Sequence, residues 1–122
     1  SAMRMEVLRT PSGATVLNDS YNANPTSMRA ALDALAALPA VRRRAVLGLM
    51  AEISQPADEH RGVLEYATRL GIEVIAYGTD LYGIEPVTDP VAALGSLAGG
   101  EAVLVKGSRV MGLERVAAAL TR

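Results

Sequence analysis

The sequence has no cysteine, no phenylalanine and no tryptophan, and His60 is its single histidine. Without cysteine there can be no disulfide or thiolate metal site, and one histidine is too few for a typical zinc site, so we expect no metal site. The 12 basic and 13 acidic residues nearly cancel, which leaves no electrostatic signature of nucleic-acid binding. No apolar run approaches the ~20 residues that span a bilayer. We therefore expect no nucleic-acid partner and no membrane insertion, and the composition fits a cytoplasmic protein.

The chain has 122 residues, half of them hydrophobic, which is enough for one globular domain. Residues 1–3, Ser-Ala-Met, are typical of a cloning remnant, and we expect residues 4–122 to form a single domain. Residues 5–9 and 14–18 are strand-like segments that flank a turn containing proline and glycine. The domain is therefore predicted to open on a β-hairpin.

Beyond the hairpin, apolar strand-like segments alternate with segments of helical periodicity. The strands are predicted at 44–48, 72–78 and 101–107, and the helices at Pro25, Pro56, Pro90 and after Ser108. Apolar strands that alternate with helices indicate a parallel sheet covered on both faces. We therefore expect an α/β fold: a Rossmann-like, mostly parallel sheet with helices on both faces and an N-terminal antiparallel β-hairpin.

Ligands of open α/β sheets bind at the carboxyl ends of the strands. The segments predicted to reach this edge are 18–25, 48–54, 78–83 and 106–109. None of them is a phosphate loop, because Lys106 lacks the glycine before it and the serine or threonine directly after it. No Gly-x-Gly-x-x-Gly sequence follows any strand, so dinucleotide binding is not expected.

Residues 18–28, Asn-Asp-Ser-Tyr-Asn-Ala-Asn-Pro-Thr-Ser-Met, carry more polar side chains than a strand-to-helix turn needs. Asn24 can cap the following helix, and capping alone can explain that residue. It does not explain Asp19, Tyr21 and Asn22 together. An aspartate can accept hydrogen bonds from ribose hydroxyls, a tyrosine offers a flat face to adenine, and an asparagine both donates and accepts. We therefore predict nucleotide binding by Asp19, Tyr21, Asn22 and Asn24.

A second polar segment, Val-Lys-Gly-Ser-Arg at 105–109, follows the last predicted strand. One interpretation is a capping turn, in which Ser108 caps the last helix and two cations are solvated. The other is an anion site, because a helix N-terminus attracts anions and Lys106, Ser108 and Arg109 can all donate to a carboxylate. We predict that these three residues position an acceptor substrate.

Other charged residues near this edge receive simpler interpretations. The basic segment 41–45 is predicted to be the solvated start of a strand. Asp58 and Glu59 favour the start of a helix, and Glu52 is the acidic residue most able to reach the site. His60 falls in line with the apolar residues of its helix and is predicted to pack against the core.

Four segments read together resemble one known family. They are NDSYNANPTSMRAAL (18–32), AVLGLMAEI (45–53), DEHRGV (58–63) and AVLVKGSRVMGLERV (102–116). In this order and at these spacings they are similar to the C-terminal domain of the Mur ligases, in particular those that add D-alanyl-D-alanine. The resemblance covers residues 4–120, and SYNANPTSM with VKGSR are its most distinctive parts.

The resemblance implies a three-domain, ATP-dependent amide ligase of peptidoglycan synthesis, of which this chain is the excised C-terminal domain. The other two domains would hold UDP-MurNAc-tripeptide, the phosphate loop and most of the contacts to Mg²⁺. This domain would close over ATP and present D-Ala-D-Ala, whose amine attacks an acyl phosphate formed on the tripeptide. The chain alone is then expected to be inactive.

One position departs from the family pattern. Gly48-Leu49-Met50 stands where these ligases usually have Gly-Asp-Met or Gly-Glu-Met, which removes a carboxylate from the end of a strand. Two alternatives stay open. One is a related ligase domain of the folylpolyglutamate synthase type, which the sequence SYNANP disfavours. The other is a free-standing, non-catalytic α/β interaction module.

Overall fold

The computed structural model describes residues 5–122, so the prediction for residues 1–3 lies outside the described part of the chain. The elements, in chain order, are β1 Glu6–Arg9, β2 Thr15–Asp19, α1 Pro25–Ala37, β3 Arg42–Leu47, α2 Pro56–Arg69, β4 Glu73–Ala76, α3 Pro90–Leu94, β5 Glu101–Lys106, the 3-10 helix η1 Arg109–Met111 and α4 Glu114–Leu120. Across residues 5–122, every helix is too short or too polar to cross a membrane.

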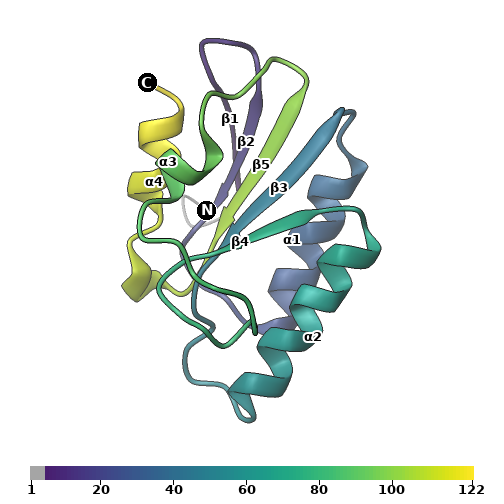
Figure 1. Ribbon diagram of the computed structural model, residues 1–122, viewed down its shortest axis with the longest axis vertical. Coiled ribbons are helices and arrows are strands. Elements are labelled where there is room, and N and C mark those ends of the chain that lie inside the picture. Colours follow the sequence, from purple (N-terminus) through teal and green to yellow (C-terminus); the bar gives the residue numbers. More distant parts are fainter. Residues whose placement is uncertain (1–4) are drawn as a thin grey trace.

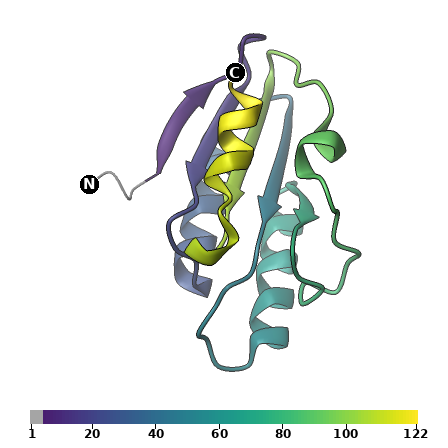
Figure 2. The same ribbon diagram turned by 90° about the vertical axis from the view of Figure 1, so that its left-hand side faces the viewer.

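The five strands form one sheet in the order β1-β2-β5-β3-β4. β1 pairs with β2 in the antiparallel sense, and the other neighbours are parallel. In Figure 1, α1 and α2 lie on one side of the sheet, and α3 and α4 lie on the other. Figure 2 shows β1 as the outermost strand at one edge. The predicted fold class, with two covered faces and an N-terminal hairpin, is confirmed.

Alternation along the central strands divides the core into two layers. In β5, Ala102 and Leu104 pack with the residues of α1 and α2, whereas Val103 and Val105 pack with those of α3 and α4. All four side chains are buried, because the strand has a helical layer on each side. The alternation then sends Lys106 toward the α1 side, where the strand ends.

The basic segment 41–45, at the start of β3, differs from its prediction. β3 begins at Arg42, and Arg44 is only 4% exposed, so the prediction of a solvated segment is wrong for Arg44. Its guanidinium donates to the Leu94 carbonyl at 3.0 Å and to the Glu101 carboxylate at 2.7 Å. These partners compensate the lost hydration, since a buried charge is tolerated only when it is paired.

The last predicted helix is divided into two. η1 ends at Met111, the next residue Gly112 has a left-handed φ of 61°, and α4 begins after Leu113. Glycine adopts such a conformation readily, and it stops the helical hydrogen bonding at this point. Ser108 makes no side-chain cap, so the prediction that it caps the last helix is wrong.

The register of the parallel strands brings three strand ends to one level. Lys106 of β5 lies opposite Asp19 of β2 on one side and Leu47 of β3 on the other. The segments after these residues therefore leave the sheet side by side. This carboxyl edge is the place where an open α/β sheet holds its ligand.

Candidate functional site at the carboxyl edge of the sheet

Lys106 links two of the segments at this edge. Its side chain is only 2% exposed, and its Nζ donates to Asp19 Oδ2 at 2.9 Å and to the Asn22 carbonyl oxygen at 2.8 Å. An ammonium removed from water needs such partners. The structure thus differs from the prediction of a lysine that faces an incoming anion: Lys106 fastens the end of β5 to the β2–α1 loop.

The β2–α1 loop begins α1 with a reciprocal cap. Asn24 Oδ1 accepts from the Ser27 amide at 2.8 Å, and Ser27 Oγ accepts from the Asn24 amide at 3.1 Å. The predicted cap is therefore confirmed. Asn22 Oδ1 accepts from the Ala23 amide at 2.9 Å. Asn22 and Asn24 are both exposed, and within the described chain their side-chain NH₂ groups make no hydrogen bond, so they can still donate to a ligand.

Tyr21 and Arg109, which the sequence assigned to two different ligands, contact each other. The Arg109 guanidinium carbon lies 5.2 Å from the centre of the Tyr21 ring. Tyr21 is 39% exposed, and Arg109 is exposed as well. A cation–π contact at such a site is worth about 0.5–1 kcal/mol. A ligand can therefore replace it at small cost, and both side chains are within its reach.

Two glycines bring the ends of β3 and β5 into close contact. A Cβ on Gly107 would lie 2.6 Å from Leu113 Cδ1 and 3.0 Å from the Cα of Gly48. A Cβ on Gly48 would lie 3.0 Å from the same leucine atom. Separations this short leave no room for a side chain. The glycines predicted at these two strand ends therefore serve close packing between neighbouring turns.

Ser108 holds the turn that follows β3. Its amide donates to the Leu49 carbonyl at 2.8 Å, and its Oγ accepts from the Ala51 amide at 2.7 Å. The side chain is buried at 4% exposure. The hydroxyl serves here as an acceptor, and its burial leaves little surface for a ligand, so Ser108 mainly shapes the site. Leu49, where the family usually has an acidic residue, contributes its backbone carbonyl here.

Two supporting residues of this turn were not predicted. His60 packs in the core with no exposed surface, as expected, but its Nε2 also accepts from the Met50 amide at 2.9 Å. The Tyr82 hydroxyl donates to the Gly48 carbonyl at 2.7 Å. These partners are 10 and 34 residues apart in the chain, so no local sequence pattern signals either bond.

The loop after this turn contains two residues with left-handed backbone conformation. Glu52 has a φ of 58° and Gln55 has a φ of 50°, which is uncommon for residues other than glycine. Glu52 is exposed and forms no ion pair or hydrogen bond with the described residues. The structure thus leaves Glu52 next to the site without joining it to the other predicted residues.

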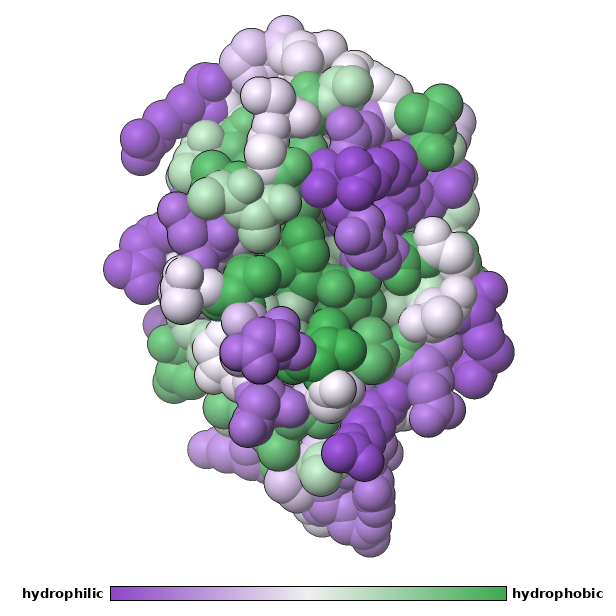
Figure 3. All heavy atoms as spheres, viewed as in Figure 1, coloured by the Kyte–Doolittle hydropathy of each residue, from purple (hydrophilic) through white to green (hydrophobic). Residues whose placement is uncertain are grey.

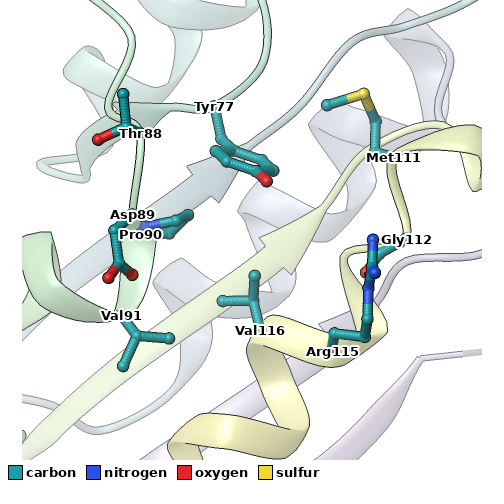
Figure 4. Close-up of a pocket in the computed structure, with 9 residues that line it drawn as sticks. All are labelled: Tyr77, Thr88, Asp89, Pro90, Val91, Met111, Gly112, Arg115 and Val116. Carbon is teal, nitrogen blue, oxygen red and sulfur yellow. The ribbon is translucent and has the colours of Figure 1, made fainter.

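A separate hollow lies on the α3 and α4 side of the sheet. Figure 3 shows hydrophobic side chains gathered across the middle of the face seen in Figure 1, around β4 and the chain that follows it. A cavity of about 280 Å³ lies here between Tyr77, the start of α3 at Pro90, and Val116 of α4 (Figure 4). Its lining contains none of the residues predicted to bind a ligand, so it is distinct from the site at the strand ends.

Within residues 5–122, no three histidine or acidic side chains come together in a way that could hold a metal ion. Asp19, the last residue of β2, has one carboxylate oxygen bonded to Lys106. We therefore assign no metal ligand and derive no metal-dependent step from this chain.

Fold and site together define a class: a Rossmann-like α/β domain whose exposed polar side chains gather at the carboxyl edge of a parallel sheet. The family described as Mur ligase, glutamate ligase domain, matches residues 3–109. The chain belongs to this Mur ligase family.

Curated relatives include the UDP-N-acetylmuramoyl-tripeptide–D-alanyl-D-alanine ligases of Mycobacterium leprae and Mycobacterium tuberculosis. Each is 36% identical to this chain, of which the alignments cover 96% and 98%. The chain spans only 29% and 31% of the length of these two relatives. The family is therefore established for one part of a longer enzyme type.

Two solved structures share the fold across nearly the whole chain. The MurF ligase of Thermotoga maritima in complex with ADP has a TM-score of 0.79 at 23% identity, and covers 98% of this chain with 30% of its own. MurF from Acinetobacter baumannii has a TM-score of 0.78 at 23% identity, and covers 99% of this chain with 30% of its own. Both confirm the fold.

Proposed function

We propose that the chain is the C-terminal domain of an ATP-dependent ligase that adds D-Ala-D-Ala to UDP-MurNAc-tripeptide in peptidoglycan synthesis. The observation that carries the proposal is the meeting of the β2–α1 loop and the Lys-Gly-Ser-Arg turn at one sheet edge, in a chain of the Mur ligase family. The relatives described above bear this ligase's name, which favours it over a folylpolyglutamate synthase. Nucleotide-linked substrates imply a cytoplasmic enzyme.

The β2–α1 loop fits a nucleoside. Asp19 has one carboxylate oxygen bonded to Lys106 and a second that no described residue engages, which can accept from ribose hydroxyls. The exposed Tyr21 ring offers a stacking face, and Asn22 and Asn24 offer side-chain donors. The solved MurF neighbour from Thermotoga maritima contains ADP, which supports a nucleotide as the ligand. ATP would supply the phosphoryl group that activates the tripeptide carboxylate, and other domains would hold Mg²⁺.

The Lys-Gly-Ser-Arg turn fits the acceptor. Arg109 is the exposed cation of the three predicted residues, whereas Lys106 and Ser108 are buried and engaged. Arg109 is therefore assigned to the dipeptide carboxylate, and Lys106 and Ser108 hold its backbone in place. A guanidinium suits this task because it binds a carboxylate with two parallel hydrogen bonds.

The proposed chemical contribution of this domain is positioning. The dipeptide has one fixed anion, its carboxylate, and its amine must stay free to attack the activated tripeptide. Donors that grip the carboxylate therefore aim the amine. A misplacement of about 1 Å can lower the rate ~100-fold.

The test uses the full-length enzyme that contains this chain. Arg109→Ala removes a charge-assisted hydrogen bond worth about 1.5–3 kcal/mol, so the dipeptide KM should rise roughly 10- to 100-fold. Formation of the acyl phosphate from ATP and the tripeptide, trapped with hydroxylamine, should be largely spared. Arg115→Ala is the matched control, because Arg115 is also exposed but lies in α4 beside the separate hollow.

Tyr21→Leu tests the nucleotide side in the same assay. Stacking of a base on an aromatic ring is worth about 1–3 kcal/mol, so the KM for ATP should rise by about tenfold or more while the dipeptide KM changes less. If Arg109→Ala leaves both dipeptide KM and turnover at wild-type values, the Lys-Gly-Ser-Arg segment is a structural turn and the acceptor assignment is wrong.

A further inference from the structure

The turn formed by residues 48–51, which follows β3, is held by hydrogen bonds at four successive backbone positions. The bonds are Tyr82 hydroxyl to Gly48 carbonyl (2.7 Å), Ser108 amide to Leu49 carbonyl (2.8 Å), Met50 amide to His60 Nε2 (2.9 Å) and Ala51 amide to Ser108 Oγ (2.7 Å). The partners come from α2, from the β4–α3 connection and from the segment after β5. Three segments far apart in the chain therefore fix the backbone of this one turn.

We propose that His60 and Tyr82 are positioning residues, which hold the turn 48–51 against Ser108 and thereby set the position of Arg109. The proposal deepens the acceptor role of Arg109 and rests on the proposed function for its catalytic consequence. We call the hydrogen bonds from His60, Tyr82 and Ser108 to the turn 48–51 the clamp, and the clamp itself rests only on the contacts of the described chain. Neither His60 nor Tyr82 is assigned contact with a substrate.

His60 can serve as a clamp in one protonation state. Its Nε2 accepts from the Met50 amide, so Nε2 carries no proton, and Nδ1 lies 2.6 Å from the Pro56 carbonyl and donates to it. Burial lowers the pKa of His60, which supports the neutral form. The hydrogen bond to the Pro56 carbonyl and the charge of Glu59 on the same helix raise the pKa but do not outweigh burial. The Tyr82 ring lies edge-on to the imidazole, 4.9 Å away.

Tyr82 supports the other end of the same turn. Its side chain is fully buried, and its hydroxyl donates to the Gly48 carbonyl. Burial raises the pKa of Tyr82, so the phenol keeps its proton and remains a donor. The two rings pack at an interplanar angle of 75°, so each fixes the other.

The clamp is connected to Arg109 through the backbone of Ser108. Ser108 directly precedes Arg109, and both its amide and its hydroxyl bind the turn 48–51. The Gly48 amide in turn donates to the Lys106 carbonyl at 2.9 Å. Without the hydrogen bond to His60, the turn 48–51 would therefore hold Ser108 less firmly. The guanidinium of the next residue, Arg109, would then no longer be kept in one position.

Two matched substitutions separate the hydrogen bond from the packing. His60→Gln places an acceptor near the position of Nε2, whereas His60→Asn keeps a polar group near Nδ1 and leaves the Met50 amide unpaired. Both remove the ring that packs on Tyr82. Amide hydrogen exchange of Met50 and Ser108, followed by NMR in the 122-residue chain, should be roughly three- to tenfold faster in His60→Asn than in His60→Gln. Val103 in the centre of β5 serves as the internal control.

Tyr82→Phe gives a second, independent perturbation, since it removes only the hydroxyl. It should also accelerate Ser108 exchange relative to wild type and leave Val103 unchanged. The single histidine allows the ring nitrogens of His60 to be identified directly in ¹⁵N spectra of the wild-type chain. A protonated Nδ1 with a bare Nε2 is expected, and the opposite tautomer would overturn the proposal. Equal Met50 exchange in the two His60 variants would overturn it as well.

The catalytic consequence is measured in the full-length enzyme. The dipeptide KM of His60→Asn should exceed that of His60→Gln several-fold, with equal KM values for ATP. Equal dipeptide KM values would show that the clamp does not position Arg109. A wild-type enzyme without ligase activity would instead contradict the proposed function, and the exchange result would still decide the clamp.

Discussion

The two members of the ion pair between Lys106 and Asp19 differ in solvent exposure, and this predicts that mutating them will destabilise the fold by different amounts. The lysine side chain is 2% exposed and the aspartate side chain is 18% exposed. Asp19→Asn leaves an ammonium away from water with only neutral oxygens as partners, among them the Asn22 carbonyl. Removing one member of a buried pair costs about 3–5 kcal/mol, and we expect the lower end because that carbonyl stays.

Lys106→Met acts on the other side of the same contact. It removes the buried charge and keeps most of the apolar volume, while Asp19 retains enough exposure to be hydrated. The expected loss is about 1 kcal/mol, the lower limit for a polar group left without its partner. The double variant should lose less than the sum of the single variants, by at least about 1 kcal/mol, because the two residues contact each other.

Urea unfolding of the 122-residue chain measures these differences. A domain is stabilised by about 5–15 kcal/mol, so every variant should still show a folded baseline at low denaturant. If Asp19→Asn and Lys106→Met destabilise equally, or if their effects simply add, Lys106 is hydrated in solution and the buried link does not exist. The same variants matter for enzyme kinetics, since a change at Asp19 disturbs Lys106 as well as the ribose contact that we propose.

Two further predictions concern stability. Gly107→Ala should destabilise the chain by about 1–3 kcal/mol in urea unfolding, because its Cβ would lie 3.0 Å from the Cα of Gly48. Gly62→Ala is its control and should be neutral or stabilising, since it lies within a helix and meets only the end of a flexible arginine side chain. Burial lowers the pKa of His60 below its ordinary 6.5, so the unfolded chain binds the proton more readily. The contribution of His60 to stability is therefore complete above about pH 6.5 and declines as the pH falls toward its folded pKa, and His60→Gln should lack this decline.

Much of the fold could be predicted because it depends on local periodicity. The apolar runs of β3 and β5 can only be buried between two layers, and this requires helices on both faces. Prolines at the first helical positions fixed the starts of α1, α2 and α3. The Asn24 cap could be predicted for the same reason, since its partners lie within three residues.

The errors arose where a distant partner decided the outcome. Arg44 belongs to a basic run that suggests solvent, yet Glu101 and the Leu94 carbonyl pair with it from far along the chain. Serine is a common helix cap, which is why Ser108 was predicted to be one. Gly112, however, interrupts the helix after η1, and the Ser108 hydroxyl accepts a hydrogen bond from the Ala51 amide instead. Three-dimensional pairing overrode local propensity in both cases.

The two polar segments were assigned to different ligands, yet the structure joins them twice. Lys106, from the acceptor segment, binds Asp19 of the nucleotide segment, and Arg109 lies over the ring of Tyr21. If, as we propose, a nucleoside stacks on the face of Tyr21 that Arg109 covers, it displaces the guanidinium, which can then bind the dipeptide carboxylate. Linkage makes the effect reciprocal, so a dipeptide that draws Arg109 away exposes the ring to the base. The lost cation–π contact is worth only about 0.5–1 kcal/mol, so this coupling favours joint binding by about two- to fivefold and leaves each ligand able to bind first.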